Sequence, residues 1–243
     1  MRGLWIVGIW LALGGCGRYF PQGLEPASQQ AAGMTVNDDG SITYVLDRLA
    51  INLKPMTDAE LNRQFPSEST GGAASVNPYT FGDLRAPGED WTPSRFTVMQ
   101  LKVSNYQYPK VRFDPLKVTI LSPNNRTYKS MSYAQMYNYY RAFWQGRTGK
   151  GRVDFRDRTS ILKQTMYTEA TTIFSGNEQE GYLVFPRLDD DVTSIQLKIE
   201  DIGVRFDYSD AAVETIDLAF SFEREVLRGY NLADAAPTDA VRR

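Results

Sequence analysis

The stretch AAVETIDLAFSFEREV, residues 211–226, has the clearest strand pattern in the chain. Its apolar side chains fall on every second position, and most of the positions between them are polar. Because successive side chains of a strand point to opposite faces of a sheet, this alternation predicts a strand with one buried and one solvated face. Strands of that kind are typical of antiparallel sheets. The expected buried set is Ile216, Leu218, Phe220 and Phe222.

Further segments resemble this stretch. They cover residues 41–55, 95–105, 110–123, 181–186 and 193–208. The alternation changes phase within 41–55 and again near 201–203, and both changes predict a β-bulge that moves the side chains to the other face. The 14 tyrosines and 12 phenylalanines also favour strands. We therefore expect a mainly β protein, an antiparallel β-sandwich without βαβ units.

A helical insertion is expected between about residues 130 and 170. Residues 132–145 carry large side chains at helical spacing, and 159–170 form a weaker second helix. This aromatic face either packs on the sandwich or leaves its distal end open as a docking surface, and Tyr137 and Tyr140 are expected to be buried in both cases. The face consists of Tyr133, Met136, Tyr137, Tyr140, Phe143 and Trp144.

The rest of the chain is divided by composition. Residues 16–40 are rich in Gln, Ala, Gly and Pro without any period, which predicts a flexible tether with a typical reach of about 25–30 Å. The sandwich is expected to span 41–232, and it includes a short helix that begins after the Thr57/Glu60 capping-box pattern. A long loop at 66–94 holds many Pro and Gly residues, and loops of that length are often functional. Residues 233–243 are expected to form a disordered tail.

The N-terminus has the form of an export signal. Arg2 is followed by an uncharged apolar stretch, residues 3–15, which is too short to span a bilayer as a helix. These features predict a removable signal peptide over residues 1–15. An ordinary signal peptide with an incidental cysteine is the alternative.

Leu13-Gly14-Gly15-Cys16 resembles the lipobox of bacterial lipoproteins, and Cys16 is the only cysteine of the chain. The resemblance implies that the signal is cut before Cys16 and that its sulfur carries a diacylglycerol. Gly17 stands where an Asp often retains such proteins in the inner membrane. The resemblance therefore implies a lipid-anchored protein of the bacterial cell envelope, sorted to the outer membrane and facing the periplasm or the surface.

The strand blocks at 95–105, 111–123, 181–186 and 216–225 resemble an immunoglobulin-like domain found on bacterial lipoproteins. This resemblance implies a binding or structural module, and it carries over no functional residues.

The composition removes several kinds of chemistry. The chain has no histidine, which excludes Ser-His-Asp and Cys-His catalysis and every metal site built on imidazole. We expect no cofactor, no metal and no enzymatic activity, but a binding or assembly module. A carboxylate-based hydrolase and a small-ligand-binding lipoprotein are the alternatives: two carboxyl groups about 5–9 Å apart in a cleft would favour the first, and a closed apolar cavity the second.

Charge is unevenly distributed along the chain. Residues 141–163 carry a net charge of +5 and residues 178–201 a net charge of −5. The two runs either attract each other within the fold, or the basic run binds anionic head groups, a cell-wall polymer or an acidic envelope protein. The overall charge of −2 gives no support for nucleic-acid binding. Asp189-Asp190-Asp191 is expected to be a solvated turn, since its spacing does not fit a calcium loop. The candidate partner-binding residues are Phe143, Trp144, Arg147, Lys150 and Arg152.

Overall fold

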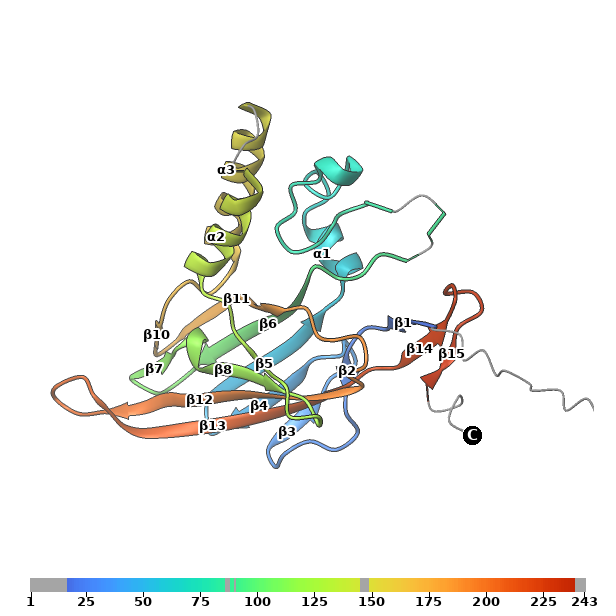
Figure 1. The fold of residues 1–243 in the computed structure, drawn as a ribbon. Helices are drawn as coiled ribbons and strands as arrows, with labels where there is room; N and C mark the ends of the chain where they lie inside the picture. Colours follow the sequence, from blue (N-terminus) through green and yellow to red (C-terminus); the bar gives the residue numbers. More distant parts are fainter. Residues whose placement is uncertain (1–16, 86–87, 90, 145–148, 239–243) are drawn as a thin grey trace, which may run out of the picture.

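The computed structural model describes residues 17–238 apart from 86–87, 90 and 145–148. Two antiparallel sheets face each other across one hydrophobic core, and a small third sheet lies at one end (Figure 1). The expectation of a mainly β, antiparallel protein is therefore confirmed. The signal peptide expected at 1–15, the lipid site Cys16 and residues 239–243 of the expected tail lie outside the described residues.

The first sheet has the strand order β11-β6-β5-β4-β3. Its strands are β3 (Met34–Val36), β4 (Ile42–Leu46), β5 (Leu49–Met56), β6 (Phe96–Asn105) and β11 (Asn177–Pro186). The bulge expected within 41–55 is wrong, because β4 and β5 form a hairpin in which Leu46 pairs with Leu49. The two-residue turn contains Asp47 with a φ of 50°, and it returns the chain so that both apolar sets face the core.

The second sheet has the order β10-β7-β12-β13-β2, and β8 pairs with both β12 and β9. Its long strands, β12 (Ser194–Phe206) and β13 (Ala212–Glu223), have an irregular register between Ile199 and Ile202. This irregularity confirms the break expected near 201–203. The shorter strands are β2 (Glu25–Pro26), β7 (Lys110–Phe113), β8 (Val118–Leu121), β9 (Thr127–Lys129) and β10 (Thr171–Phe174), and a 3₁₀ turn, η2 (Pro115–Lys117), separates β7 from β8.

The main core lies between the two sheets. Ile51 and Leu101 of the first sheet and Leu197 and Phe220 of the second belong to one cluster and are fully buried. Within the stretch that shows the clearest alternation, Leu218, Phe220 and Phe222 are buried and Ile216 is half-buried. That pattern is confirmed.

The helices lie on the outer face of the first sheet (Figure 1). They are α1 (Asp58–Gln64), η1 (Gly72–Ala74), α2 (Tyr133–Trp144) and α3 (Gly149–Thr165). A second hydrophobic cluster joins α1, α2, α3 and the loop at 66–94 to outward-facing side chains of β6 and β11, among them Val98 and Val184. The capping box at Thr57 and Glu60 is present. No helix in the described ranges is long and apolar enough to cross a bilayer.

The N-terminal segment is folded rather than flexible. β1 (Arg18–Pro21) pairs with β14 (Val226–Gly229), and β14 pairs with β15 (Ala236–Pro237). β2 and β3 join the second and first sheets. The tether expected at 16–40, in its described part, and the tail expected at 233–238 are therefore corrected. These strands are two to four residues long and β1 and β2 pair with strands about 200 residues away, so the local sequence shows no period.

The Phe20 side chain tests this correction. It is 1% exposed and contacts Trp91 edge-to-face with ring centroids 5.4 Å apart. We expect Phe20→Ala to lower the free energy of unfolding by about 3–5 kcal/mol, because a buried aromatic ring is removed. Phe174→Ala removes a ring that is 57% exposed and should change it little. Urea unfolding of a chain that starts at residue 17 measures both changes. If both substitutions lower the free energy of unfolding equally little, residue 20 lies in a flexible tether and the correction is wrong.

Candidate binding site between the helical hairpin and the long loop

The helical hairpin, defined as α2 and α3, stands on the first sheet through one face. A reciprocal cap starts it, since Gln135 N donates to Ser132 Oγ (3.2 Å) and Ser132 N donates to Gln135 Oε1 (2.7 Å). Tyr140 is 3% exposed, as expected. Tyr137 was expected to be buried, and that is wrong because it is 37% exposed. Its ring lies on the side of α2 that faces α3, where it packs edge-to-face on Phe155 with centroids 5.0 Å apart.

The long loop at 66–94 is held on the hairpin by buried polar contacts. Asn77 is fully buried, donates to Ser69 Oγ (2.9 Å) and accepts from Tyr79 N (2.9 Å). The buried Tyr79 hydroxyl is 2.5 Å from Thr165 Oγ1 of α3. Gly82 has a φ of 62°, and a Cβ there would lie 2.4 Å from the Ser69 carbonyl oxygen, so a side chain does not fit. The part of the loop around residues 69–82 is therefore an ordered wall beside the hairpin.

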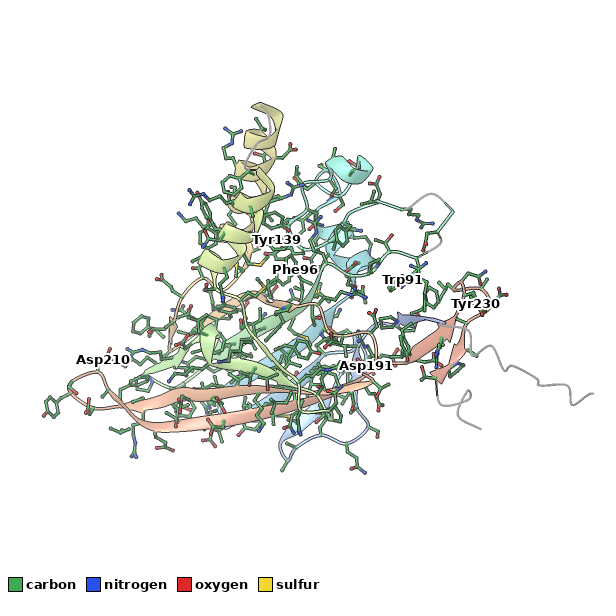
Figure 2. All side chains as sticks on the ribbon, viewed as in Figure 1. Trp91, Phe96, Tyr139, Asp191, Asp210 and Tyr230 are labelled. Atoms are coloured by element: carbon green, nitrogen blue, oxygen red, sulfur yellow. The ribbon has the colours of Figure 1, made fainter. Side chains whose placement is uncertain are left out.

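A cavity of about 210 Å³ lies between the loop and the hairpin, and we call it the hairpin cleft. Figure 2 labels Tyr139 at the foot of the hairpin beside Phe96, and these two rings are 5.1 Å apart. Phe81 and Leu84 of the loop line the cleft, together with Arg95, which directly precedes β6. The hairpin contributes Tyr139 and Tyr140 of α2 and Asp154, Phe155 and Arg158 of α3. Its walls combine four aromatic rings with small residues, two arginines and the carboxylate-bearing Asp154.

Arg95 is the most distinctive group of the cleft. Its guanidinium carbon lies 4.2 Å from the centroid of the Phe81 ring, and its Nη1 donates to the Tyr140 hydroxyl at 3.0 Å. Its Nε is buried and has no hydrogen-bond partner among the described atoms. It also has no ion pair in the described ranges. A buried donor without a partner is uncommon in folded proteins and needs an explanation.

Arg158, on α3, lies beside the Tyr140 ring. Its guanidinium carbon lies 5.4 Å from the Tyr140 centroid, and its Nη2 donates to the Ser75 carbonyl. The Arg95 guanidinium is 5.8 Å from that centroid. Burial raises the pKa of Tyr140 to about 12, and Arg95 and Arg158 only partly oppose this, so the hydroxyl stays a neutral donor to the Pro78 carbonyl (2.6 Å). Guanidinium groups beside aromatic rings favour a ligand that combines an anion with a flat apolar part.

The partner residues expected from the sequence lie at the distal end of the hairpin. Phe143 and Trp144 fall in the last turn of α2, and Lys150 and Arg152 in the first turn of α3. The positions of these four side chains, and all of Arg147, lie outside what the structure describes. The cleft reaches the same first turn of α3 at Gly151 and continues along α3 to Arg158. Sequence reasoning missed Arg95 and Phe81, and the length of the loop was the only signal toward them.

The two charged runs do not neutralise each other in the ion pairs of the described residues. The acidic run binds cations from other parts of the chain: Lys102 pairs with Glu178 at 3.0 Å and Lys117 with Asp201 at 2.9 Å. Arg187 pairs with Asp190 within the run itself. Strand pairing brings these other cations beside the acidic residues. The expectation that the two runs attract each other stays a prediction, because the side chains of Lys150 and Arg152 and all of Arg147 lie outside the described residues.

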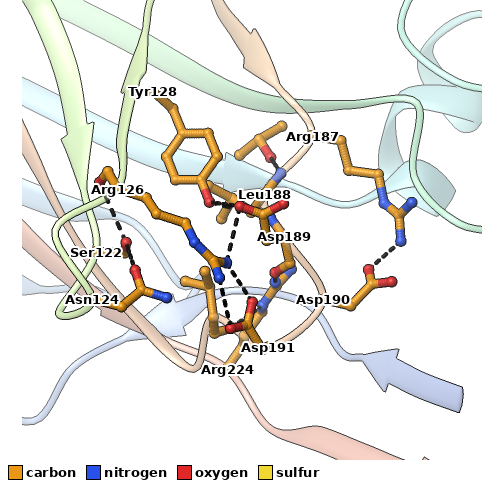
Figure 3. Close-up of polar contacts among 12 residues, drawn as sticks. Ser122, Asn124, Arg126, Tyr128, Arg187, Leu188, Asp189, Asp190, Asp191 and Arg224 are labelled. Carbon is orange, nitrogen blue, oxygen red and sulfur yellow. Dashed lines mark hydrogen bonds and ion pairs between the residues drawn. The ribbon is translucent and has the colours of Figure 1, made fainter.

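The Asp189–Asp191 turn is satisfied by its own neighbours (Figure 3). Arg126 Nη1 is 3.0 Å from Asp189 Oδ2 and 2.5 Å from Asp191 Oδ1, and the Tyr128 hydroxyl donates to Asp189 at 2.6 Å. The hydrogen bond from Arg126 lowers the pKa of Asp191. Arg224 donates to the carbonyl of Asp189 at 2.6 Å. Within the described ranges, no group of three His, Cys, Asp or Glu residues is placed to hold a metal ion.

Asp39 and Glu60 are two carboxyl groups that lie close to each other, beside Lys54. Lys54 Nζ is 4.0 Å from Asp39 Oδ2 and 3.0 Å from Glu60 Oε1, so these oxygens are at most about 7 Å apart. A hydrogen bond from Ser41 lowers the pKa of Asp39. Burial acts to raise the pKa of Glu60, but hydrogen bonds from Thr57 and Lys54 outweigh it and lower that pKa. Both groups are ionised, whereas hydrolysis needs one protonated acid, so this pair does not fit the reaction.

Asp58 differs from this pair. It lines a second cavity of about 150 Å³ with Trp91 and Arg187, and it is the one carboxyl group among the described residues of that lining. Burial raises the pKa of Asp58 to about 6, and a hydrogen bond from Ser94 and the charge of Arg95 oppose the rise. A single carboxyl group does not supply both the acid and the second carboxylate of a glycosidase.

Neither family models, curated proteins nor solved structures contain a match to this chain. The case for a function therefore rests on the residues and their geometry.

Asp58 gives the fold a pH dependence of known sign. Between about pH 4 and 6 the folded chain keeps a proton that the unfolded chain, with a pKa near 3.8, has lost. Asp58 therefore lowers the free energy of unfolding as the pH rises through this window. We expect the stability difference, Asp58→Asn minus wild type, to grow by about 2–3 kcal/mol between pH 4 and 7, measured by urea unfolding.

Asp207 offers the opposite control. This exposed carboxylate accepts from Ser209 and Ala211, which lowers its pKa. The difference for Asp207→Asn should therefore shrink as the pH rises through the lower acidic range. A flat profile for Asp58→Asn would mean that its carboxyl group is solvated.

Proposed function

We propose that this chain is a lipid-anchored binding module of the bacterial cell envelope, and that the hairpin cleft is its binding site. The observation that carries the proposal is Arg95: a guanidinium stacked on Phe81, bonded to Tyr140, with a buried Nε that no described atom satisfies. A bound anion would pair with the charge of this guanidinium, which has no ion pair among the described residues. The module is not an enzyme in this proposal, since the paired carboxylates near Lys54 are both ionised.

The anchor in this proposal is the lipid on Cys16. Support comes from the resemblance of Leu13-Gly14-Gly15-Cys16 to a lipobox and from the short apolar stretch before it. Gly17 favours sorting to the outer membrane. The cleft would then serve the periplasm or the cell surface.

The scaffold is proposed to be an immunoglobulin-like sandwich. Such domains place strands A, B and E in one sheet and C, F and G in the other, with C′ beside C in the variable type. The order β5-β6-β11 matches A-B-E, and β9-β8-β12-β13 matches C′-C-F-G. The helical hairpin then occupies the chain position of strand D. This correspondence supports the resemblance to immunoglobulin-like domains.

The ligand class follows from the walls of the cleft. A volume of about 210 Å³ is below the roughly 300–1,000 Å³ of drug-sized pockets. It suits one ring with a short acidic group. Phe81, Tyr139 and Phe155 offer flat apolar surface, and Arg95 offers charge-assisted donors. We therefore propose a small aromatic carboxylate.

A docking role for an envelope protein is the second candidate. Tyr137 and Val153 of the hairpin are 37% and 46% exposed, which is high for apolar side chains on facing helices. Together with the basic distal end, they offer a surface for an acidic partner. This role needs no ligand in the cleft.

The anchor has a direct test. Cys16→Ser removes the sulfur that would accept the lipid, so we expect complete loss of labelling by a fatty-acid probe and release from the membrane fraction. Expression in a Gram-negative host with membrane fractionation measures both. Cys16 has no second cysteine to replace it. Labelling that persists in the variant would contradict a lipid on this residue.

The cleft is tested with phenylacetate and its neutral analogue phenylacetamide, using calorimetry or ligand-observed NMR. We expect wild type to prefer the acid and Arg95→Gln to weaken its binding at least about 10-fold, since a hydrogen bond to a charged group contributes about 1.5–3 kcal/mol.

Arg112→Gln is the matched control. Arg112 also lies over a ring, Phe206 at 4.9 Å, but it pairs with Asp210 outside the cleft. It should leave phenylacetate binding unchanged. If wild type binds phenylacetate and phenylacetamide with equal affinity, the cleft is not an anion site. This comparison uses wild type alone, so it holds even if Arg95→Gln fails to fold.

A further inference from the structure

The first strand begins almost at the proposed lipid site. Only Gly17 separates Cys16 from Arg18, the first residue of β1. Two residue steps span at most about 7 Å. If Cys16 carries a lipid, as proposed above, the folded domain has no room for a tether between itself and the bilayer.

β1 is also firmly held. Its four residues pair in register with β14, from Arg18 opposite Gly229 to Pro21 opposite Val226. Phe20 is buried, and Arg18 donates twice to Glu89, at 2.6 and 2.8 Å. The small sheet of β1, β14 and β15, here called the anchor sheet, is thus tied to the segment around Trp91. It therefore does not move independently of the rest of the domain.

The chemistry of the anchor sheet fits a membrane surface. Its three strands carry two charged residues, Arg18 and Arg228, and both are positive. Arg228 lies over the half-buried Tyr19 ring at 5.5 Å, and Tyr230, just after β14, is 73% exposed. Tyrosine favours the level of the head groups, and arginine is attracted to anionic lipid.

We propose that the anchor sheet lies directly against the phospholipid head groups, with Tyr19, Arg228 and Tyr230 at the interface. The lipid on Cys16 and this sheet together then fix the orientation of the domain. The turn between β12 and β13 lies at the opposite end of the molecule, and α1 and the long loop lie between the helical hairpin and the anchor sheet in this view (Figure 1). The hairpin cleft is therefore held clear of the bilayer and open to its ligand.

Two native tryptophans report on this geometry. After removal of residues 1–15 the chain keeps Trp91 and Trp144. Trp91 borders the same small recess as Arg18 and Tyr230, and Trp144 ends α2 in the hairpin. The lipidated chain is reconstituted in vesicles whose phospholipids are brominated on the acyl chain near the head group, which quenches nearby indoles. We expect Trp91 emission to be lost in Trp144→Phe, and Trp144 emission to be retained in Trp91→Phe.

A spacer variant tests whether the short link between Cys16 and β1, rather than attachment to the vesicle alone, brings Trp91 close to the bilayer. About 24 Gly/Ser residues between Gly17 and Arg18 add a reach of roughly 25–30 Å with the same lipid and the same domain. We expect the quenching of Trp91 to disappear. Persistent emission from Trp91 without the spacer, or equal quenching with it, would overturn the proposal.

Only protein that floats with the vesicles enters the comparison. A chain that does not float refutes the lipid on Cys16, whereas a chain that floats without quenching of Trp91 refutes the contact of the anchor sheet. The two failures are therefore distinguishable.

Discussion

The first sheet is buried on both of its faces along β6 and β11, and the rest of the molecule depends on this constraint. Inward side chains such as Leu101 and Leu183 join the core shared with the second sheet. Their outward neighbours, among them Val98 and Val184, join the cluster beneath the helical hairpin. Since each apolar side chain buried contributes about 1.5–3 kcal/mol, neither layer can leave the sheet without exposing it to water.

The cleft follows from how the second layer is built. Two separate insertions, the loop at 66–94 and the hairpin, both settle on the outer face of one sheet, and Tyr79 and Thr165 join them. Between them the loop and hairpin do not close completely, and the gap is lined by rings and two arginines. A binding site on rigid elements costs less entropy on ligand binding than one on a mobile loop, because its walls are already ordered.

In the proposed membrane contact, the two ends of the described chain together orient the domain on the bilayer. β1 pairs with β14, so the residues nearest the proposed lipid and the residues near the C-terminus form one small sheet at one end of the molecule. A lipid alone would leave the orientation of the domain undefined, whereas the lipid and this sheet together would fix it. The long loop takes part in both regions, the cleft and the anchor sheet, since Phe81 and Leu84 line the cleft and Glu89 and Trp91 contact β1.

The sequence alone determined those elements whose buried side chains recur at a regular local spacing. The alternation at 216–222, the capping box of Thr57 and Glu60, and the helix after Ser132 all appear where the pattern places them. Local pattern records which side of an element is buried, but not which distant segment covers it. For that reason only the tertiary structure decided that Asp47 forms a hairpin turn and that residues 18–36 contain three short strands. The same holds for the site: the first helix of the hairpin was foreseeable, whereas the second spans Gly149–Thr165 and not 159–170. The stacking of Arg95 on Phe81 depends on where the long loop packs against the hairpin.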